Sequence, residues 1–219
     1  MLYSQANSIY AVLAHGERST PGKHWFPWLT AQMEQRKVQV AAPQFPTPHH
    51  QDLTHWLETM SPYWPYLGTN SLLVGHDVGA NFILRALERL RTPICAAFLV
   101  APPMSEQAAH YGSTLASFTD TSFDWAKIRS NCAQFVVYQS DNDPYVPLES
   151  GQNLAANLGV DLTLLPGCGH FDSAAGFLKF NRLLEDITVT LSTRQGAEIV
   201  PGMHSTKFLS AHVSNLQTW

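Results

Sequence analysis

The sequence has no hydrophobic run long enough to cross a membrane and no excess of positive charge. Its apolar stretches fall short of the roughly 18–20 residues that a transmembrane helix needs. The chain carries 13 Lys and Arg against 17 Asp and Glu, a formal net charge of −4. Because this balance offers no basic surface for phosphates or anionic lipids, we expect neither a nucleic-acid nor a membrane partner.

The chain also lacks a recognisable secretory signal and is poor in cysteine. Residues 1–7 contain no basic region followed by an apolar stretch. The 3 cysteines, Cys95, Cys132 and Cys168, are odd in number and widely spaced, which favours reduced thiols in a cytoplasmic protein over a disulfide framework. No cluster has zinc-ligand spacing, and nothing points to a nucleotide or a flavin. We therefore predict no metal and no cofactor.

Hydrophobic residues make up 45% of the 219 residues, enough for the core of one domain. Short apolar runs alternate along the chain with segments of helical period, a pattern typical of a parallel sheet covered by helices on both faces. The predicted strands are 8–14, 38–42, 71–74, 94–100, 134–139 and 161–165. The predicted helices are 25–36, 51–60, 78–90, 123–129, 148–158 and 174–191. The fold class is thus α/β, a three-layer α/β/α arrangement with about six mostly parallel strands.

Three segments depart from this rhythm. Residues 43–48 form a loop punctuated by proline, and residues 101–122 form a longer connection with room for a small lid at most. The final segment, 192–219, is polar with little periodicity. We therefore divide the chain into a domain over residues 1–191 and a C-terminal tail over residues 192–219, extended or partly disordered.

The most informative motif is Gly75-His76-Asp77-Val78-Gly79, which lies between a predicted strand and a predicted helix. A Gly-x-nucleophile-x-Gly segment in this setting is the nucleophile elbow of α/β-hydrolases. The glycines permit a tight turn from which the central side chain projects. That centre is usually Ser, and here it is Asp77. Taken alone, however, most such short strings are ordinary turns.

Three further motifs follow other predicted strands. His15-Gly16-Glu17 comes after the first strand, where the backbone N–H of Glu17 is expected in an oxyanion hole together with that of Val78. Asp143 precedes a Pro-x-Val-Pro motif and is preferred over Asp141 as the acid that orients a histidine. His170 lies in a glycine-flanked loop after the last strand. The order nucleophile, acid, histidine is the one expected for this fold.

Each of these residues also has a plain structural interpretation. Asp143 alone can cap the helix that begins near Pro147, and His170 is one of 10 histidines. Cys168 is better explained by packing than by nucleophilic chemistry. It is the joint occurrence of four motifs, each at a strand end and in the right order, that favours an active site.

The chain resembles the small serine hydrolases related to retinoblastoma-binding protein 9, a compact branch of the α/β-hydrolase superfamily. The resemblance spans about residues 8–190 and rests on the motifs at 15–16, 25–29, 43–46, 56, 75–79, 140–144 and 169–171. It implies an esterase-like hydrolase with little or no cap. By this resemblance Asp143 matches the family acid and His170 the family base, whereas Asp77 stands where the family has serine.

An aspartate at the elbow changes the chemistry that is available. A carboxylate that attacks an acyl carbon gives a high-energy anhydride, but at saturated carbon it gives an ester that water can hydrolyse. We expect a small-molecule hydrolase that works through Asp77, Asp143 and His170. Two alternatives remain open: an inactive homologue that binds a ligand, either natural or made by a Ser→Asp change, and a haloalkane or epoxide hydrolase. The last lacks the usual Trp at Val78 and offers only Tyr111 or Tyr145 to polarise an oxygen.

The sequence does not define the substrate. His15, Trp25 and Phe171 lie in or beside the motif loops and suggest the wall of a substrate pocket, apolar where the aromatic residues lie. Core packing explains such residues equally well. The oligomeric state is not readable from the sequence.

Overall fold

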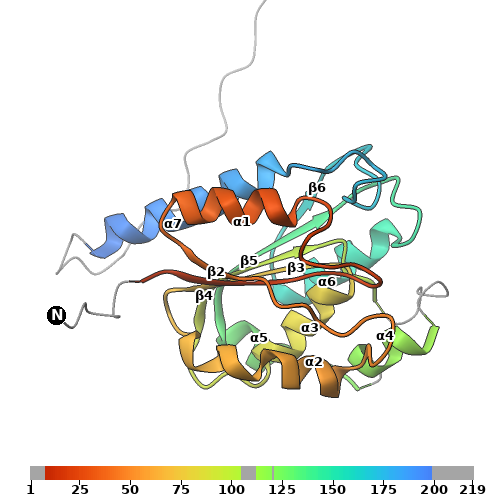
Figure 1. Ribbon diagram of the computed structural model, residues 1–219, viewed down its shortest axis with the longest axis horizontal. Coiled ribbons are helices and arrows are strands. Elements are labelled where there is room, and N and C mark those ends of the chain that lie inside the picture. Colours follow the sequence, from red (N-terminus) through yellow and green to blue (C-terminus); the bar gives the residue numbers. More distant parts are fainter. Residues whose placement is uncertain (1–7, 105–111, 120, 199–219) are drawn as a thin grey trace, which may run out of the picture.

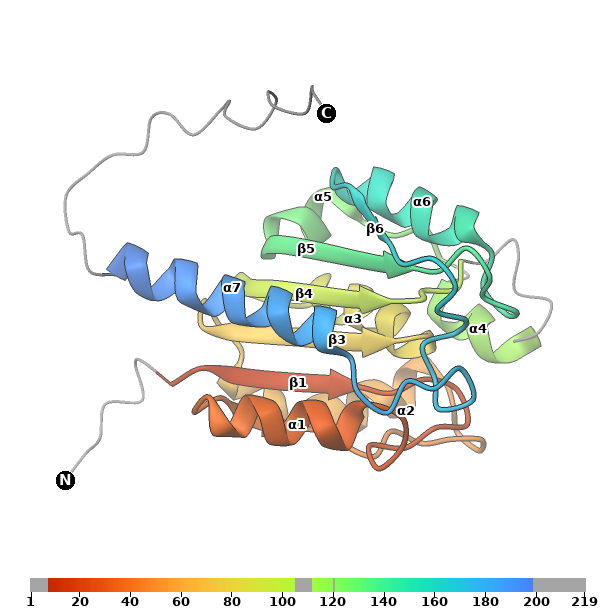
Figure 2. The same ribbon diagram turned by 90° about the horizontal axis from the view of Figure 1, so that it is seen from above.

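The computed structural model describes residues 8–104, 112–119 and 121–198. Its centre is a six-stranded sheet in the order β2-β1-β3-β4-β5-β6, in which all neighbouring strands are parallel. The strands are β1 (Tyr10–Ala14), β2 (Gln39–Ala41), β3 (Ser71–His76), β4 (Ile94–Val100), β5 (Cys132–Gln139) and β6 (Leu162–Leu164). Figure 2 shows the arrowheads of β1, β3, β4 and β5 at the same edge of the sheet. The predicted parallel α/β fold is confirmed.

Helices cover both faces of the sheet (Figure 1). Helices α1 (Phe26–Gln35) and α7 (Asn181–Glu198) lie on one face. The opposite face carries α2 (Leu53–Met60), α3 (Val78–Leu87), α4 (Gly112–Thr119), α5 (Trp125–Ser130) and α6 (Leu148–Leu158). Each face of the sheet therefore has its own hydrophobic core.

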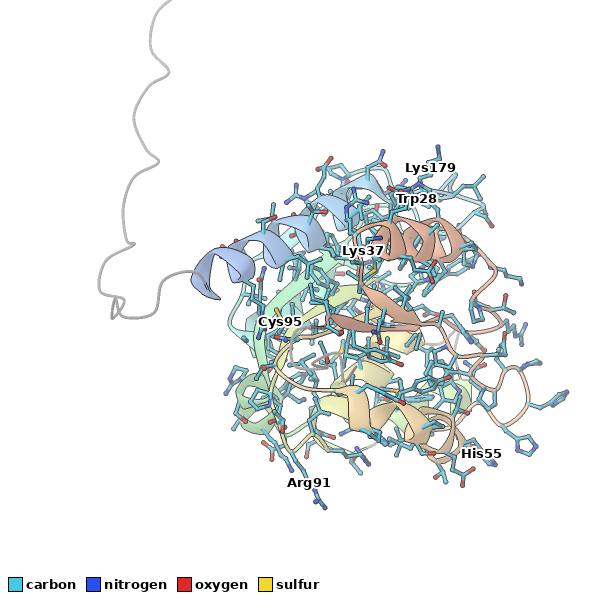
Figure 3. The ribbon with its side chains drawn as sticks, turned by 60° about the vertical axis from the view of Figure 1, so that its left-hand side comes forward. Trp28, Lys37, His55, Arg91, Cys95 and Lys179 are labelled. Carbon is cyan, nitrogen blue, oxygen red and sulfur yellow. The ribbon has the colours of Figure 1, made fainter. Side chains whose placement is uncertain are left out.

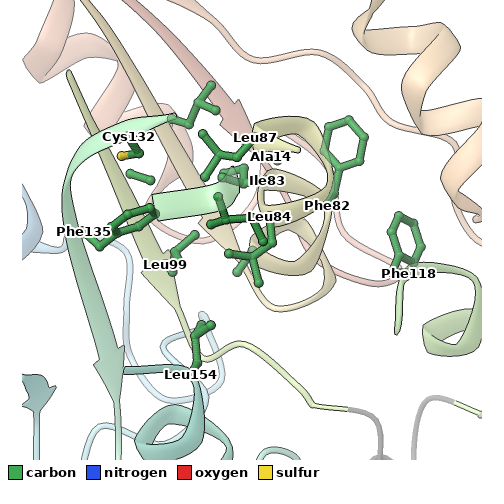
Figure 4. Close-up of a cluster of buried hydrophobic side chains, with 14 of the residues drawn as sticks. Ala14, Phe82, Ile83, Leu84, Leu87, Leu99, Phe118, Cys132, Phe135 and Leu154 are labelled. Carbon is green, nitrogen blue, oxygen red and sulfur yellow. The ribbon is translucent and has the colours of Figure 1, made fainter. Parts of the chain in front are cut away.

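The strands feed both cores because successive side chains of a strand point to opposite faces. In β1, Ala11 and Leu13 pack towards α1 and α7, while Val12 and Ala14 pack towards α3. All ten residues of α3 are buried. Figure 4 shows its side chains Phe82, Ile83, Leu84 and Leu87 at the centre of the cluster that includes Leu99 of β4 and Phe135 of β5. The helix that follows the elbow is thus the most deeply enclosed helix of the domain.

The strand order places two loops side by side. After β1 the chain crosses to β2 at the edge of the sheet and then returns to β3 on the other side of β1. In open α/β sheets, ligands bind at the carboxyl ends of the strands where the order reverses in this way. The register pairs Ala14 with Gly75, so the loop after β1 and the elbow after β3 emerge next to each other.

Most predicted elements are confirmed, and the differences lie in the C-terminal helix and tail and in two helices that were not predicted. The 148–158 helix and the 94–100 strand match α6 and β4. The last helix was predicted at 174–191 but begins at Asn181, because residues 171–180 form turns and irregular structure, and it continues to Glu198. The prediction of an extended tail is therefore wrong for 192–198, and 199–219 lie outside the described residues. A 3₁₀-helix over Ser61–Tyr66 was not predicted.

The predicted connection at 101–122 contains α4, and its residues 105–111 and 120 lie outside the described part. Phe118 of α4 is buried against Trp56 of α2, with ring centroids 5.1 Å apart. Arg85 of α3 donates from Nε to the Phe118 carbonyl at 2.8 Å. These contacts fasten α4 to the α2–α3 layer, which agrees with the expectation of little or no cap.

Two features of the fold bear on the composition. Cys132 packs in the core on the α3 face and Cys95 in the core on the α1 face, so their side chains lie on opposite sides of the sheet. Figure 3 shows Cys95 together with two exposed side chains, Lys37 near α1 and Arg91 at the lower edge of the view. Within the described ranges, no helix combines the length and hydrophobicity needed to span a membrane.

The elbow glycines generate a prediction about stability. A Cβ at Gly79 would collide with the carbonyl oxygens of Ala14 and His15, which belong to β1 and the loop after it. We expect Gly79→Ala to lower the free energy of unfolding by about 1–3 kcal/mol or more, the usual cost of overpacking a core. The matched control is Gly68→Ala, because nothing lies within 4 Å of a Cβ built at Gly68. Urea unfolding measures both, and equal losses in the two variants would contradict the argument.

Candidate active site

Asp77 lies at the tip of the turn between β3 and α3 in a strained backbone conformation. Its φ is 58° and its ψ is −130°, a region that residues with a side chain rarely adopt. The turn is fixed by bonds from the Asp77 N–H to the Val100 carbonyl (2.8 Å) and from the Ala80 N–H to the Asp77 carbonyl (2.9 Å). The glycine pattern predicted a tight turn here, and its role as a nucleophile elbow stays a prediction.

The loop after β1 meets the Asp77 carboxylate. The Glu17 N–H donates to Asp77 Oδ2 at 2.7 Å. Gly16 permits this approach, because a Cβ there would lie 2.5 Å from Oδ2 and 2.7 Å from the Asp77 Cβ. The predicted N–H donor of Glu17 thus faces the elbow side chain. Val78 follows Asp77 with its side chain in the core, and its part in an oxyanion hole stays a prediction.

The structure brings His170 between the two predicted carboxylates. His170 Nδ1 lies 2.8 Å from Asp143 Oδ2, and His170 Nε2 lies 3.9 Å from Asp77 Oδ1. Asp143 Oδ1 accepts the N–H groups of Tyr145 and Val146 at 2.9 and 3.0 Å. Asp143 therefore closes its own loop with one oxygen and holds the imidazole with the other. The Asp141 carboxylate accepts the Gly167 N–H at 2.8 Å, whereas the imidazole pairs with Asp143. This difference supports the choice of Asp143.

The loop that carries His170 is held by hydrogen bonds between its backbone and side chains of other segments. Three successive N–H groups, those of residues 167, 168 and 169, donate to Asp141 Oδ1, Ser140 Oγ and Asn142 Oδ1 at 2.8–2.9 Å. The next two carbonyls are also held. His76 Nε2–H donates to the His170 carbonyl at 2.8 Å, and the Trp25 indole N–H donates to the Phe171 carbonyl at 2.9 Å.

These five hydrogen bonds hold the backbone of the loop and so fix the position of the His170 ring. None of them involves an imidazole nitrogen of His170. The His76 ring packs on the His170 ring at 4.8 Å between centroids, and Tyr145 stands edge-on to His170 at 5.1 Å. His76 is fully buried, which lowers its pKa well below the usual value, so it is neutral and donates through Nε2. His76 thus has a structural role: its neutral ring supports the His170 loop.

The electrostatics of His170 follow from its two neighbours. Burial lowers the pKa of the imidazole, but the hydrogen bond that His170 donates to Asp143 and the negative charges of Asp77 and Asp143 raise it. The net result is a pKa above the ordinary value of histidine. The ring is therefore protonated more easily than that of an ordinary histidine.

A cleft of about 210 Å³ opens over these groups, and its lining is polar. Besides Asp77 and His170, the lining residues include Arg18, Ser19, Lys23, His24, Tyr145 and Asp172. The expectation that His15, Trp25 and Phe171 form the substrate pocket is not met. All three are fully buried and lie outside the lining. His15 and Trp25 hydrogen-bond to backbone groups, and the Phe171 ring stacks on Phe180 in the core.

His15 has a structural role of this kind. Its Nε2 accepts the Phe45 N–H at 3.0 Å, which leaves the proton on Nδ1, 3.0 Å from the Gly16 carbonyl. Burial lowers the pKa of His15 and favours this neutral form. The side chain therefore fixes the turn that presents the Glu17 N–H to Asp77.

No group of three or more His, Cys, Asp or Glu in the described part of the chain is arranged to hold a metal ion. What the site offers is a carboxylate held by a backbone amide, an imidazole, and a second carboxylate that orients it. Chemically, three such groups can serve as a nucleophile, a general base and an acid that orients the base.

Comparison with known proteins agrees with the fold. The family model described as "Serine hydrolase" matches residues 11–188. The chain belongs to this serine hydrolase family. YdeN of Bacillus subtilis is 32% identical over 165 residues, covering 75% of this chain and 87% of YdeN. Serine hydrolase RBBP9 of Rattus norvegicus is 24% identical over 159 residues, covering 72% of this chain and 82% of that protein.

Solved structures place the chain among the same serine hydrolases and their fold neighbours. The crystal structure of the B. subtilis ydeN gene product matches with a TM-score of 0.79 and 30% identity, covering 84% of this chain and 100% of that one. Est1E from Butyrivibrio proteoclasticus matches with a TM-score of 0.64, at 13% identity over 84% of this chain and 89% of that chain, which supports the fold alone.

Sequence reasoning missed several residues that the site depends on. Ser140 and Asn142 lie in the acid motif, but their bonds join segments 27–28 residues apart that only the sheet brings together. Ser19, Lys23 and His24 carry no motif at all and lie on the wall of the cleft only because of how the loop after β1 folds. A signal was present for His76, which directly precedes the elbow residue.

The causes of the raised His170 pKa can be tested directly. Asp77→Asn and Asp143→Asn each remove a negative charge that favours the imidazolium, so both are expected to lower the His170 pKa, and Asp143→Asn more, because it also weakens the hydrogen bond. Asp141→Asn is the control, since its oxygen still accepts the Gly167 N–H. Proton NMR titration of the His170 ring measures the values. An unchanged pKa in Asp77→Asn would contradict the assignment.

Proposed function

We propose that the chain is a hydrolase of small molecules in which Asp77 attacks a saturated carbon and His170 activates the water that releases the product. One observation carries the proposal: the two carboxylate oxygens of Asp77 have different neighbours. Oδ2 accepts the Glu17 N–H at 2.7 Å, while Oδ1 lies on the side of His170, 3.9 Å from Nε2. One oxygen thus faces a backbone donor, and the other faces the imidazole that would activate water.

In the first step, a lone pair of Oδ1 forms a bond to the substrate carbon as the bond to the leaving group breaks. The leaving group departs with the bonding pair. The enzyme then carries an alkyl ester on Asp77, whose carbonyl oxygen is Oδ2. Attack on an ester carbonyl would instead give an anhydride, so the carboxylate favours saturated carbon.

In the second step, His170 Nε2 takes a proton from water as the water oxygen adds to Asp77 Cγ. Negative charge develops on Oδ2, which the Glu17 N–H already faces, so the donor stabilises this intermediate. The bond between Cγ and Oδ1 then breaks, and the alcohol leaves with the proton from His170. The product oxygen comes from Asp77, and the water oxygen stays in the Asp77 carboxyl group, which releases its remaining proton to solvent and becomes a carboxylate again.

The raised pKa of His170 fits this sequence of steps. In the free protein the charge of Asp77 helps to keep the imidazole protonated, a poor state for a base. Formation of the ester removes that charge, so the pKa of His170 falls when a base is needed. The first step requires only that Asp77 be ionised.

An inactive binding protein is the competing function, and the ion pair of His170 with Asp77 is the observation that favours it. A carboxylate that holds a backbone N–H and a protonated imidazole forms a stable arrangement. The two functions differ in whether a covalent adduct forms on Asp77.

The covalent step has a direct test. His170→Gln removes the base of the second step, so we expect an alkyl ester to accumulate when this variant is incubated with panels of alkyl halides and epoxides. Intact mass and peptide mapping locate the adduct. The double variant His170→Gln with Asp77→Ala is the control and is expected to stay unmodified.

Oxygen labelling gives the second arm of this test. In a single turnover of the unaltered protein in water enriched in heavy oxygen, the label is expected in Asp77 and not in the alcohol. Label in the product would mean that water attacks the substrate directly, and Asp77 would not be the nucleophile. No adduct with any compound, together with esterase activity in Asp77→Ser, would favour the inactive function.

The pH dependence offers a separate prediction. Hydrolysis of the ester needs neutral His170, so its single-turnover rate is expected to rise with pH through the His170 pKa. Because the ester lacks the charge of Asp77, that pKa should lie below the value from NMR titration of the free protein. An equal or higher kinetic pKa would contradict the role of Asp77 in holding the proton.

A further inference from the structure

The wall of the cleft contains a buried hydroxyl with unused hydrogen-bonding capacity. Ser19 lies in the loop after β1, is 3% exposed, and lines the cleft. Its Oγ has no hydrogen-bond partner among the described residues. A buried hydroxyl without a partner is costly, so its retention beside the reacting groups points to a polar group of the substrate.

His24 supplies a second donor on the same wall. Its Nδ1 accepts the Ser173 N–H at 2.9 Å, which leaves the proton of the neutral ring on Nε2. Burial lowers the pKa of His24, the charge of Lys23 lowers it further, and Asp172 only partly opposes them. His24 therefore stays neutral and offers an N–H group.

Lys23 adds positive charge next to His24. Its ammonium donates to the Arg18 carbonyl at 3.3 Å, and in the described ranges no carboxylate lies within ion-pair distance of it. The other charges of the lining are partly satisfied locally. Arg18 Nε lies 3.8 Å from Glu17 Oε1, and Asp172 Oδ1 accepts the Ala175 N–H at 2.9 Å.

We propose that Ser19, Lys23 and His24 bind a carboxylate of the substrate, so that the preferred substrates are short acids whose reacting carbon faces Asp77. This deepens the proposed function and rests on it for the identity of the reacting carbon. One uncompensated ammonium suits a single negative charge. The small volume and polar lining of the cleft suit a chain of few carbons. Covalent chemistry is unchanged: Oδ1 displaces the leaving group, and water releases a hydroxy acid.

Binding can be tested without turnover. We expect propionate to bind more tightly than the matched neutral propionamide, measured by chemical-shift titration of the His24 ring. Lys23→Met is expected to weaken propionate binding by about tenfold or more, as for the loss of one hydrogen bond to a charged group, and Ser19→Ala to weaken it less. Lys37→Met, which removes a charge at the end of α1, is the control (Figure 3). Equal affinity for acid and amide, or no effect of Lys23→Met, would overturn the proposal.

The reactive pair 2-chloropropionate and 2-chloropropionamide separates this inference from the proposed function. We expect the acid to alkylate Asp77 faster, and Lys23→Met to raise KM for the acid while kcat changes little. If acid and amide alkylate Asp77 equally, the carboxylate site is wrong and the nucleophile stands. If neither alkylates Asp77 although propionate binds through Lys23, the proposed nucleophile is wrong and the anion site stands.

Discussion

The close contact between the loop after β1 and the turn after β3 is the constraint on which the site depends. Gly79 lets the start of α3 press against the backbone of Ala14 and His15, and Gly16 lets the returning loop reach Asp77. The Glu17 N–H then lies 2.7 Å from the carboxylate. Because a single added methyl group at either glycine would open this contact, the site is part of the core packing.

The second constraint is the hydrogen-bonded loop that carries His170. Backbone groups of five consecutive residues are held by side chains from three separate segments, at 25, 76 and 140–142. None of these bonds uses the imidazole nitrogens, which remain for Asp143 and for chemistry at Asp77. A base that must take and return a proton without moving its ring is well served by such a frame.

Replacement of the family serine by aspartate alters the charge of the site more than its shape. A hydroxyl would leave His170 with one carboxylate, whereas Asp77 adds a second and helps to raise the pKa of the imidazole. The same carboxylate fits the N–H of Glu17. In the proposed mechanism, formation of an ester would remove the charge of Asp77 and so free the histidine to act as a base.

The sequence by itself determined the parallel α/β fold, the elbow, and the grouping of Asp77, Asp143 and His170, because hydrophobic periodicity and glycine spacing are local and the carboxyl ends of parallel strands share one edge. Tertiary structure decided which side chains reach the cleft. His15, Trp25 and Phe171 were expected to line it, yet all three are fully buried. His15 and Trp25 bind backbone and Phe171 stacks on Phe180, while Ser19, Lys23 and His24 line the wall without any motif. The direction of a loop side chain depends on contacts with segments that are distant in the sequence, such as the hydrogen bond between His24 and Ser173. The residues adjacent in the sequence do not specify those contacts.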